Sequence, residues 1–262
     1  MSPRIALPLD IRLMNVTAIG LLVLAGLMAA GGAIWSLLRL PVFGIQAITV
    51  EGDVVHNNAV TLRANVMPQL SGNFFTLDLA DARKAFESVP WVRLAEVHRQ
   101  FPNRLRVVLR EHEPVALWGD VADGTLVNRQ ADVFEAAADD QETEHLPRFR
   151  GPRGESRQVV QMHAFLLPLF EAVGMKIEVL ELSARGSWRV ETGSGAVLEL
   201  GRGTQQEIAQ RLQLFWRTLA QVTARYGRTP ASLATADLRH VEGYALQLKG
   251  VTTFEGDGRK KP

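Results

Sequence analysis

The chain opens with one long apolar segment, and short strand and helix patterns follow it. No charged residue occurs between Leu13 and Leu38, and an arginine flanks the segment at each end. As a helix this segment would extend about 39 Å, which exceeds the roughly 30 Å hydrocarbon core of a bilayer. The pattern predicts a transmembrane helix over residues 13–40, behind a short tail at residues 1–12.

A cleaved signal peptide is the alternative interpretation of the apolar segment, because small residues around positions 28–31 resemble a cleavage site. Ile34, Trp35 and Leu37 carry the apolar run beyond a signal core, which favours a retained anchor. The tail holds more positive than negative charge, so the positive-inside rule favours a cytoplasmic amino terminus. Everything after Leu40 is then expected outside the cytoplasm, as in a single-pass, type II protein of the inner membrane.

Residues 41–115 have the pattern of a small α+β domain. A strand is predicted over Ile45–Glu51, and a helix over Asn58–Met67. A second helix is predicted between Asp78, a favourable N-cap residue, and Pro90, which ends it.

Two strands joined by a turn at Pro102-Asn103 complete this first domain. Alternation predicts an inward face for the first strand, made of Trp91, Ala95, Val97 and Phe101. The inward face predicted for the second strand consists of Leu105, Val107 and Leu109. The intervening positions include His98, Arg104, Arg106 and Arg110, so one face of these two strands is predicted to be solvent-exposed and basic. The predicted order of elements is β-α-α-β-β.

Residues 116–250 have the pattern of a second domain made of strands, turns and helices, and residues 251–262 are predicted to be a flexible tail. A hairpin is predicted across residues 126–134, and the glycines and prolines of Leu146–Gly154 predict a fixed turn. A helix is predicted over Gln158–Val173, with a kink or a break at Pro168. Three strands are predicted next, over residues 177–182, 188–191 and 196–200.

The clearest helix signal of the chain begins at Thr204. Thr204 and Glu207 have the spacing of a capping box, and Gly227 stands where a helix C-terminal glycine belongs. One apolar stripe follows, formed by Ile208, Leu212, Phe215, Leu219, Val222 and Tyr226. Packing of this stripe against a sheet is favoured over binding of a partner helix. Strands over Ala236–Val241 and Tyr244–Lys249 are predicted to close the domain.

Composition excludes several kinds of chemistry. The chain has no cysteine and a formal net charge of +1, and no basic run is longer than Arg259–Lys261. These features argue against thiolate sites, disulfides and nucleic-acid binding. Ser194 lacks the flanking pattern of a nucleophile elbow, and the histidines lack metal-ligand spacing. We therefore expect that the protein is not an enzyme and that it binds no cofactor, no metal and no small-molecule substrate.

A spaced string of residues in the first domain resembles the POTRA domain of the FtsQ/DivIB family. The string is Trp91-Val92, Ala95-x-Val97-x-Arg99-x-Phe101-Pro102, Leu105-x-Val107 and Glu111-x-x-Pro114-Val115-Ala116-x-Trp118. Further on, Leu146-Pro147 with Gly151-Pro152 and Asp237-Leu238-Arg239 are similar to the same family, although His240 stands where the family commonly has tyrosine. The resemblance implies an α+β fold: one transmembrane helix, a POTRA domain, then a mixed β-domain with helices packed on an extended sheet.

The resemblance also implies a function in bacterial cell division. FtsQ-like proteins are non-catalytic scaffolds of the divisome at the septum, where they bind FtsB and FtsL through the C-terminal strand region, connect early and late division proteins and contribute to control of septal wall assembly. The residues that it assigns to partner binding are Arg185, Arg239, His240, Val241, Tyr244, Ala245 and Leu246. A POTRA protein of secretion or outer-membrane assembly is the alternative. Because little chain follows Tyr244–Lys249, this strand is expected at an open sheet edge, where a partner strand can pair with it.

Overall fold

A computed structural model describes residues 9–52, 54–119, 124–136, 143–240 and 243–251 of the chain. Contacts between residues divide the chain into two units, one ending at Glu111 and the other beginning at His112. The predicted tail at residues 251–262 lies outside the described residues except for Val251.

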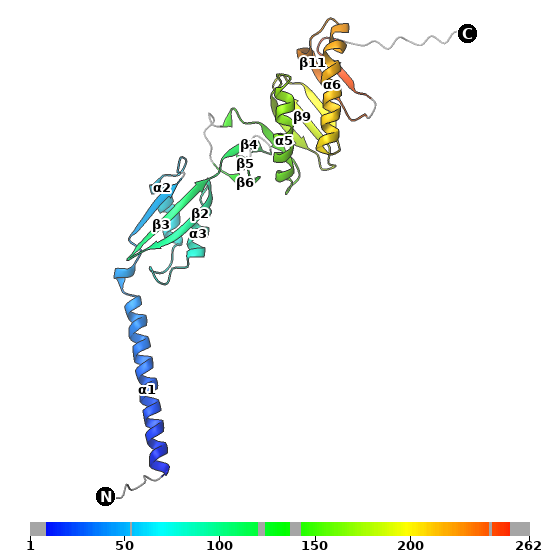
Figure 1. The fold of residues 1–262 in the computed structure, drawn as a ribbon. Helices are drawn as coiled ribbons and strands as arrows, with labels where there is room; N and C mark the ends of the chain where they lie inside the picture. Colours follow the sequence, from blue (N-terminus) through cyan, green and yellow to red (C-terminus); the bar gives the residue numbers. More distant parts are fainter. Residues whose placement is uncertain (1–8, 53, 120–123, 137–142, 241–242, 252–262) are drawn as a thin grey trace, which may run out of the picture. The chain divides into compact units, whose positions relative to one another are not determined.

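The first unit starts with the long helix α1, Leu9–Leu38 (Figure 1). Among the described residues, Leu13–Leu38 is the one helical segment with the length and composition to span a membrane. The helix begins before Leu13 and ends earlier than the predicted position 40, since Pro41 starts the short 3-10 helix η1, Pro41–Phe43. Next to its end, the Arg39 guanidinium lies 3.8 Å from the centre of the Trp35 ring, a cation–π contact.

A compact domain with the predicted β-α-α-β-β order follows α1. Its elements are β1 (Ala47–Gly52), α2 (Ala59–Val66), η2 (Met67–Gln69), α3 (Leu79–Glu87), β2 (Val92–Gln100) and β3 (Arg104–Glu111). The sheet order is β1-β3-β2, with β1 parallel and β2 antiparallel to the central strand. Asp78 caps α3 as predicted, by accepting a hydrogen bond from the Ala80 N–H. The helices and the sheet share a core that includes Leu62, Phe86 and Leu105.

The prediction that Phe101 faces inward is wrong. Its side chain is 74% exposed, and the residue lies beyond the end of β2 in the turn toward β3. A β-bulge between Val92 and Leu94 shifts the pairing register, so strict alternation from Trp91 does not hold along the strand. Ala95 is buried as predicted.

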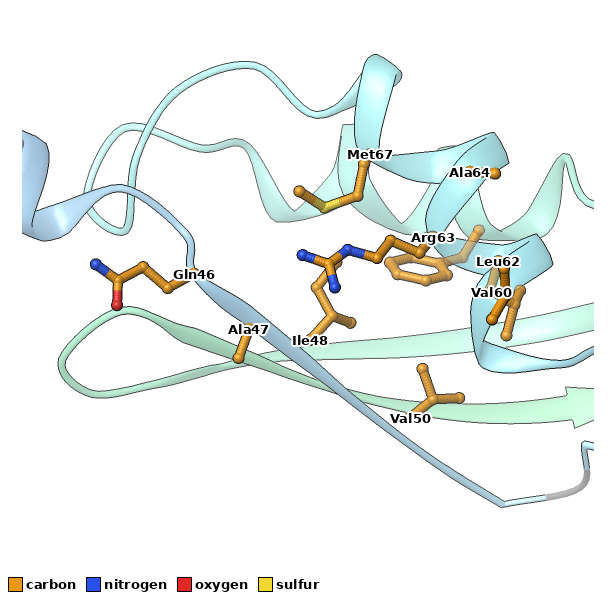
Figure 2. A pocket seen from close by; sticks show the side chains of 10 residues that line it. Gln46, Ala47, Ile48, Val50, Val60, Leu62, Arg63, Ala64 and Met67 are labelled. Atoms are coloured by element: carbon orange, nitrogen blue, oxygen red, sulfur yellow. The ribbon is translucent and has the colours of Figure 1, made fainter.

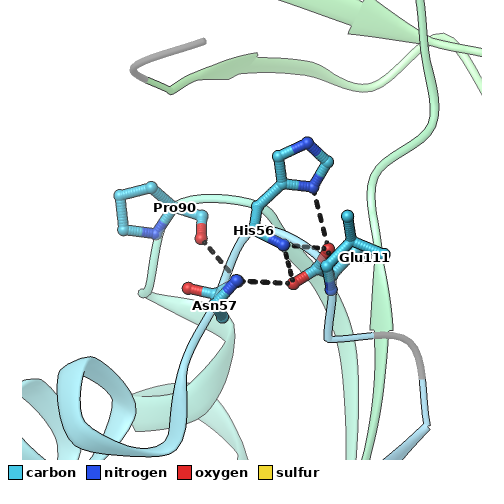
Figure 3. A network of polar contacts seen from close by, with 5 residues as sticks. His56, Asn57, Pro90 and Glu111 are labelled. Atoms are coloured by element: carbon cyan, nitrogen blue, oxygen red, sulfur yellow. Dashed lines mark hydrogen bonds and ion pairs between the residues drawn. The ribbon is translucent and has the colours of Figure 1, made fainter. Parts of the chain in front are cut away.

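Glu111, the last residue of β3, holds the segment that leads from β1 into α2 (Figure 3). Its carboxylate accepts hydrogen bonds of 3.1 Å from the backbone N–H groups of Val55, His56 and Asn57. The Asn57 side chain donates to the same carboxylate at 2.9 Å and to the Pro90 carbonyl at 3.2 Å. One carboxylate therefore satisfies several donors of a segment that contains the buried Asn57.

The second unit is built on one mixed sheet with two long helices. Its elements are β4 (Pro114–Trp118), β5 (Thr125–Asn128), β6 (Val133–Glu135), β7 (Arg148–Arg150), α5 (Ser156–Glu171), β8 (Ile177–Leu182), β9 (Trp188–Thr192), β10 (Val197–Gly201), α6 (Gln205–Arg225), η4 (Pro230–Ser232), β11 (Leu233–Asp237) and β12 (Ala245–Leu248). The nine strands follow the order β12-β11-β10-β9-β8-β7-β4-β5-β6. The two domains together confirm the predicted α+β class.

Helices α5 and α6 lie against the sheet (Figure 1), and they share one core with its inward side chains. The capping box of Thr204 and Glu207 is present at the start of α6. The apolar stripe of α6 packs into the core, as favoured from the sequence, but the buried residues near the end of the helix are not the predicted ones. Thr223 is buried in place of Val222, and Tyr226 is exposed. The α5 helix continues through Pro168 without a break.

Two parts of the second domain differ from the prediction. The stretch predicted as a fixed turn contains β7, which pairs in parallel with both β4 and β8. The strand predicted over Ala236–Val241 is β11, Leu233–Asp237, and Arg239 lies beyond its end because its backbone N–H and guanidinium both bond to the Asp237 carboxylate. The pairing of this strand with β12 is antiparallel.

Candidate site at the edge strand

Strand β12 lies at one end of the nine-stranded sheet. Within the described part of the chain it pairs with β11 alone, and Asp237 stands opposite Ala245. An edge strand exposes a row of backbone N–H and C=O groups that a further strand can satisfy. Beta-strand addition is therefore open to this side of the domain.

Two backbone hydrogen bonds show which groups of β12 face outward. The Lys249 N–H donates to the Ser232 carbonyl at 2.8 Å, and on β11 the Leu238 N–H donates to the Glu199 carbonyl of β10 at 2.8 Å. Successive N–H groups of a strand point to opposite sides in the plane of the sheet. Along β12 from Lys249, and opposite β11 in the register of Asp237 with Ala245, the N–H of Ala245 therefore points toward β11 and that of Leu246 points toward the open side.

The side chains of this segment point alternately to core and solvent. Leu246 and Tyr244 pack against the core, while Ala245 is exposed. The Tyr244 ring contacts Phe215 of α6 edge-to-face, with centroids 4.9 Å apart, and its hydroxyl lies 2.6 Å from that of Thr218. Tyr244 precedes β12 and serves to hold the strand on α6, so its hydroxyl already has an intramolecular partner.

Arg185 and Arg239 line one surface hollow, although 54 positions separate them in the chain. The hollow has a volume of about 520 Å³, and its remaining lining residues are Ser183, Ser187, Gly201, Arg202 and Arg211. Arg211 is committed to the carbonyls of Leu200 and Arg202. Arg185 and Arg202 form no ion pair with any described residue, so the hollow presents unpaired positive charge.

Arg239 is held in place by Asp237. The guanidinium bonds both carboxylate oxygens, at 2.9 Å from Nε and 2.5 Å from Nη2. The hydrogen bonds from Arg239 lower the pKa of Asp237 to about 2. Because this carboxylate stays charged at any pH well above that value, the ion pair that orients Arg239 persists between pH 4 and pH 8.

A row of charged residues crosses the sheet on the face opposite the helices and ends at the edge strand. Cross-strand register places these residues side by side in the order Arg150, Glu181, Arg189, Glu199 and Asp237, next to Ala245. Arg189 and Glu199 are 3.5 Å apart. Opposite charges on neighbouring strands stabilise the pairing from Arg150 to Glu199. Glu199 and Asp237 are both acidic, and Arg239 supplies the opposite charge at the end of the row by folding onto Asp237.

The structure therefore brings together most of the residues assigned from the sequence. Ala245 and Leu246 lie on the edge strand, Arg185 and Arg239 share the hollow, and Tyr244 anchors the strand. His240 is exposed beyond β11, and Val241 lies outside the described residues. Sequence reasoning did not assign Arg202 and Arg211 to this site. The one available signal was Gly201-Arg202-Gly203 in front of a capped helix.

A larger cavity, of about 610 Å³, lies in the first domain between β1 and α2 (Figure 2). Its lining is mainly apolar, with Ile48, Val50 and Met67 around it and the Arg63 side chain crossing it. It holds no pair of acid and base side chains. Across the described residues, no group of three or more His, Asp or Glu side chains has the arrangement to hold a metal ion.

Comparison with known proteins identifies both domains. The family model of the FtsQ-type POTRA domain matches residues 43–112, and the model of the C-terminal domain of cell division protein FtsQ/DivIB matches residues 116–239. A protein named cell division protein FtsQ from Thiomonas arsenitoxydans is 39% identical over 254 residues, which cover 95% of this chain and 91% of the relative. Proteins of the same name from Burkholderia pseudomallei and Nitrosospira multiformis are each 37% identical, over 92% and 89% of this chain and 94% and 96% of their own lengths.

Proposed function

Because the chain belongs to the FtsQ/DivIB family of bacterial cell division proteins, we propose that it is a divisome scaffold that captures FtsB, together with FtsL, on strand β12. The open edge of β12 is the observation that carries this proposal. Capture needs no chemistry on the partner, which agrees with a role in holding proteins rather than in catalysis.

Backbone pairing supplies the affinity in this proposal, and the hollow supplies selectivity. A strand added beside β12 satisfies outward groups such as the Leu246 N–H. An acidic residue of the partner outside the added strand finds Arg185 and Arg202, which line the hollow and have no described ion-pair partner. The partner that fits best is therefore an extended segment accompanied by a carboxylate outside it.

A single-pass membrane protein is supported by α1, the one described helix with the length and composition to span a membrane, and by the FtsQ relatives. The proposed topology places the amino terminus in the cytoplasm and both domains in the periplasm, with the protein in the inner membrane at the septum. There it connects early and late division proteins and contributes to the control of septal wall assembly. The match of residues 116–239 to the FtsQ/DivIB C-terminal model disfavours a role in secretion or outer-membrane assembly.

The direct test is co-purification of the full-length chain in detergent with FtsB and FtsL from the same organism. A stable complex is expected, with protection of the backbone amides of β12 from hydrogen exchange. Absence of a complex would reject the proposed partners. A complex that leaves exchange at β12 unchanged would reject the proposed binding mode.

Charge reversal at the hollow tests its contribution. We expect Arg185→Glu to weaken binding of the FtsB–FtsL pair about tenfold, since it repels an acidic partner residue. The difference should shrink at high salt, because the site is exposed and screened. Arg153→Glu is the matched control, because Arg153 is an exposed arginine in the turn before α5, outside the hollow. Equal weakening by both variants would show an effect of net charge alone.

A further inference from the structure

Four phenylalanine rings form a continuous chain at one end of the first domain. Phe43 contacts Phe75, Phe75 contacts Phe74, and Phe74 contacts Phe101, with centroids 5.0, 5.2 and 6.0 Å apart. All three contacts are edge-to-face, the geometry that stabilises aromatic pairs. The rings come from three separate segments of the chain.

Much of this cluster is exposed. Phe101 is 74% exposed and Phe75 43%, and the neighbouring Val42 and Leu40 are exposed by 59% and 43%. Phe74 alone among the rings belongs to the buried set. Single exposed apolar residues are ordinary, but a contiguous group of them marks an interaction surface. We name Leu40, Val42, Phe43, Phe75 and Phe101 the aromatic patch.

Backbone hydrogen bonds fix the three segments together. The Phe74 N–H donates to the Phe43 carbonyl at 2.8 Å, and the Gln46 N–H donates to the Asn103 carbonyl at 3.0 Å. The turn between β2 and β3 therefore lies beside the chain that leaves η1, as Figure 1 shows. The aromatic patch is thus a fixed feature of this end of the domain.

The aromatic patch begins directly where the apolar helix ends. Phe43 lies five positions after Leu38, which limits the distance between the two residues to about 17 Å even for an extended chain. Pro41–Phe43 is a 3-10 turn, so the real distance is shorter. The headgroup layer of a bilayer adds roughly 5–8 Å on each side of the hydrocarbon core. Phe43 is therefore held at the level of the headgroups or just above them.

We propose that the aromatic patch docks the first domain onto the lipid surface of the bilayer that α1 spans. Aromatic side chains favour the boundary between headgroups and acyl chains. Arg39, stacked on Trp35, and the exposed Arg104 next to the hairpin turn place cations where phosphate groups lie. This combination of exposed rings and flanking arginines is the chemistry of a membrane interface.

We assign lipid rather than a protein to the aromatic patch because the patch directly follows the membrane-spanning helix α1 in the chain. Any bilayer that accepts α1 is present beside the aromatic patch at all times, at an effective concentration that no diffusing partner reaches. Docking would limit the directions in which the domain can swing about residues 39–40, and so the region in which the rest of the chain meets its partners.

The absence of cysteine makes this proposal directly testable in the full-length protein. A single cysteine introduced as Asn103→Cys, next to Phe101, carries a fluorescent NBD label in nanodiscs of phosphatidylethanolamine and phosphatidylglycerol. Lipids with a nitroxide at acyl carbon 5 quench labels that reach the interface. Val55→Cys is the matched control, because its side chain is 82% exposed and follows the opposite end of β1.

We expect quenching of the label at position 103 to exceed that at position 55 several-fold. Phe75→Ser combined with Phe101→Ser should reduce the quenching at 103 to the level of position 55. Both side chains are exposed, so these changes leave the core intact, which hydrogen exchange of β2 and β3 verifies. Equal quenching at the two positions overturns the proposal, and so does quenching at 103 that survives both serine substitutions.

Discussion

Leu246→Pro is expected to weaken capture of the FtsB–FtsL pair by about 5- to 150-fold, whereas Leu246→Ala should change it less than about threefold. Proline removes the N–H that points to the open side of β12, which leaves a carbonyl of the added strand without a donor. An unsatisfied acceptor of this kind costs about 1–3 kcal/mol. Proline is tolerated at edge positions whose N–H faces away from the sheet, so the bonds between β12 and β11 should persist.

The alanine variant separates backbone from side chain. Both substitutions remove the half-buried Leu246 side chain from the core, but alanine keeps the backbone donor. Titration of each purified full-length variant with the FtsB–FtsL pair gives the dissociation constants, and hydrogen exchange of β11 reports whether the sheet is intact. Equal weakening by the two variants would attribute binding to the side chain and remove the basis of strand addition.

Local sequence signals predicted the elements that depend on neighbours in the chain. The capping box of Thr204 and Glu207 fixes the start of α6 through bonds across three residues, so it is readable without knowledge of the fold. Asp78 at the start of α3 is readable for the same reason. The edge position of β12 was expected from the sequence, and the strand order of the described residues confirms it.

The short strand β7, which depends on distant partners, was not predicted. The three residues of β7 become a strand only because β4 and β8 pair with them on either side. No local pattern distinguishes such a segment from a turn rich in glycine and proline. The basic hollow likewise exists because the turn after β8 and the segment after β11 meet in space, and Arg202 and Arg211 belong to it through tertiary structure alone.

The failed prediction for Phe101 has a physical cause of its own. Alternation assigns a face only while the strand lasts, and β2 ends at Gln100. A large exposed ring on a hairpin turn has no explanation within the domain core, and the proposed docking of the aromatic patch onto lipid accounts for it.

Glu111→Ala is expected to destabilise the first domain by about 3 kcal/mol. The substitution leaves the N–H groups of Val55, His56 and Asn57 and the Asn57 side chain without their acceptor, and hydrogen bonds to a charged group are worth about 1.5–3 kcal/mol each before water replaces some of them. Hydrogen exchange in α2, which follows this segment, should accelerate correspondingly. Glu113→Ala is the matched control.

The control removes a carboxylate two positions away that is largely exposed. Glu113 contacts Arg129 at 3.5 Å, with both side chains more than 70% exposed. Exposed ion pairs contribute about 0–1 kcal/mol, so exchange in α2 should remain close to that of the unmodified protein. Similar acceleration by both substitutions would show that Glu111 has no special role.

The pH dependence of stability provides an independent measure of the same carboxylate. Burial alone would raise the pKa of Glu111, but the hydrogen bonds from His56 and Asn57 outweigh burial and lower it. A lowered folded-state pKa means that the ionised carboxylate stabilises the fold above its unfolded pKa of about 4.3, and that this stabilisation is lost as the pH falls through the folded value.

Glu111→Gln keeps one acceptor oxygen but cannot ionise. The stability difference between the native chain and Glu111→Gln should therefore decrease as the pH falls below about 4. A difference that stays constant down to pH 3 would show that the shape of the side chain, and not its charge, holds this segment.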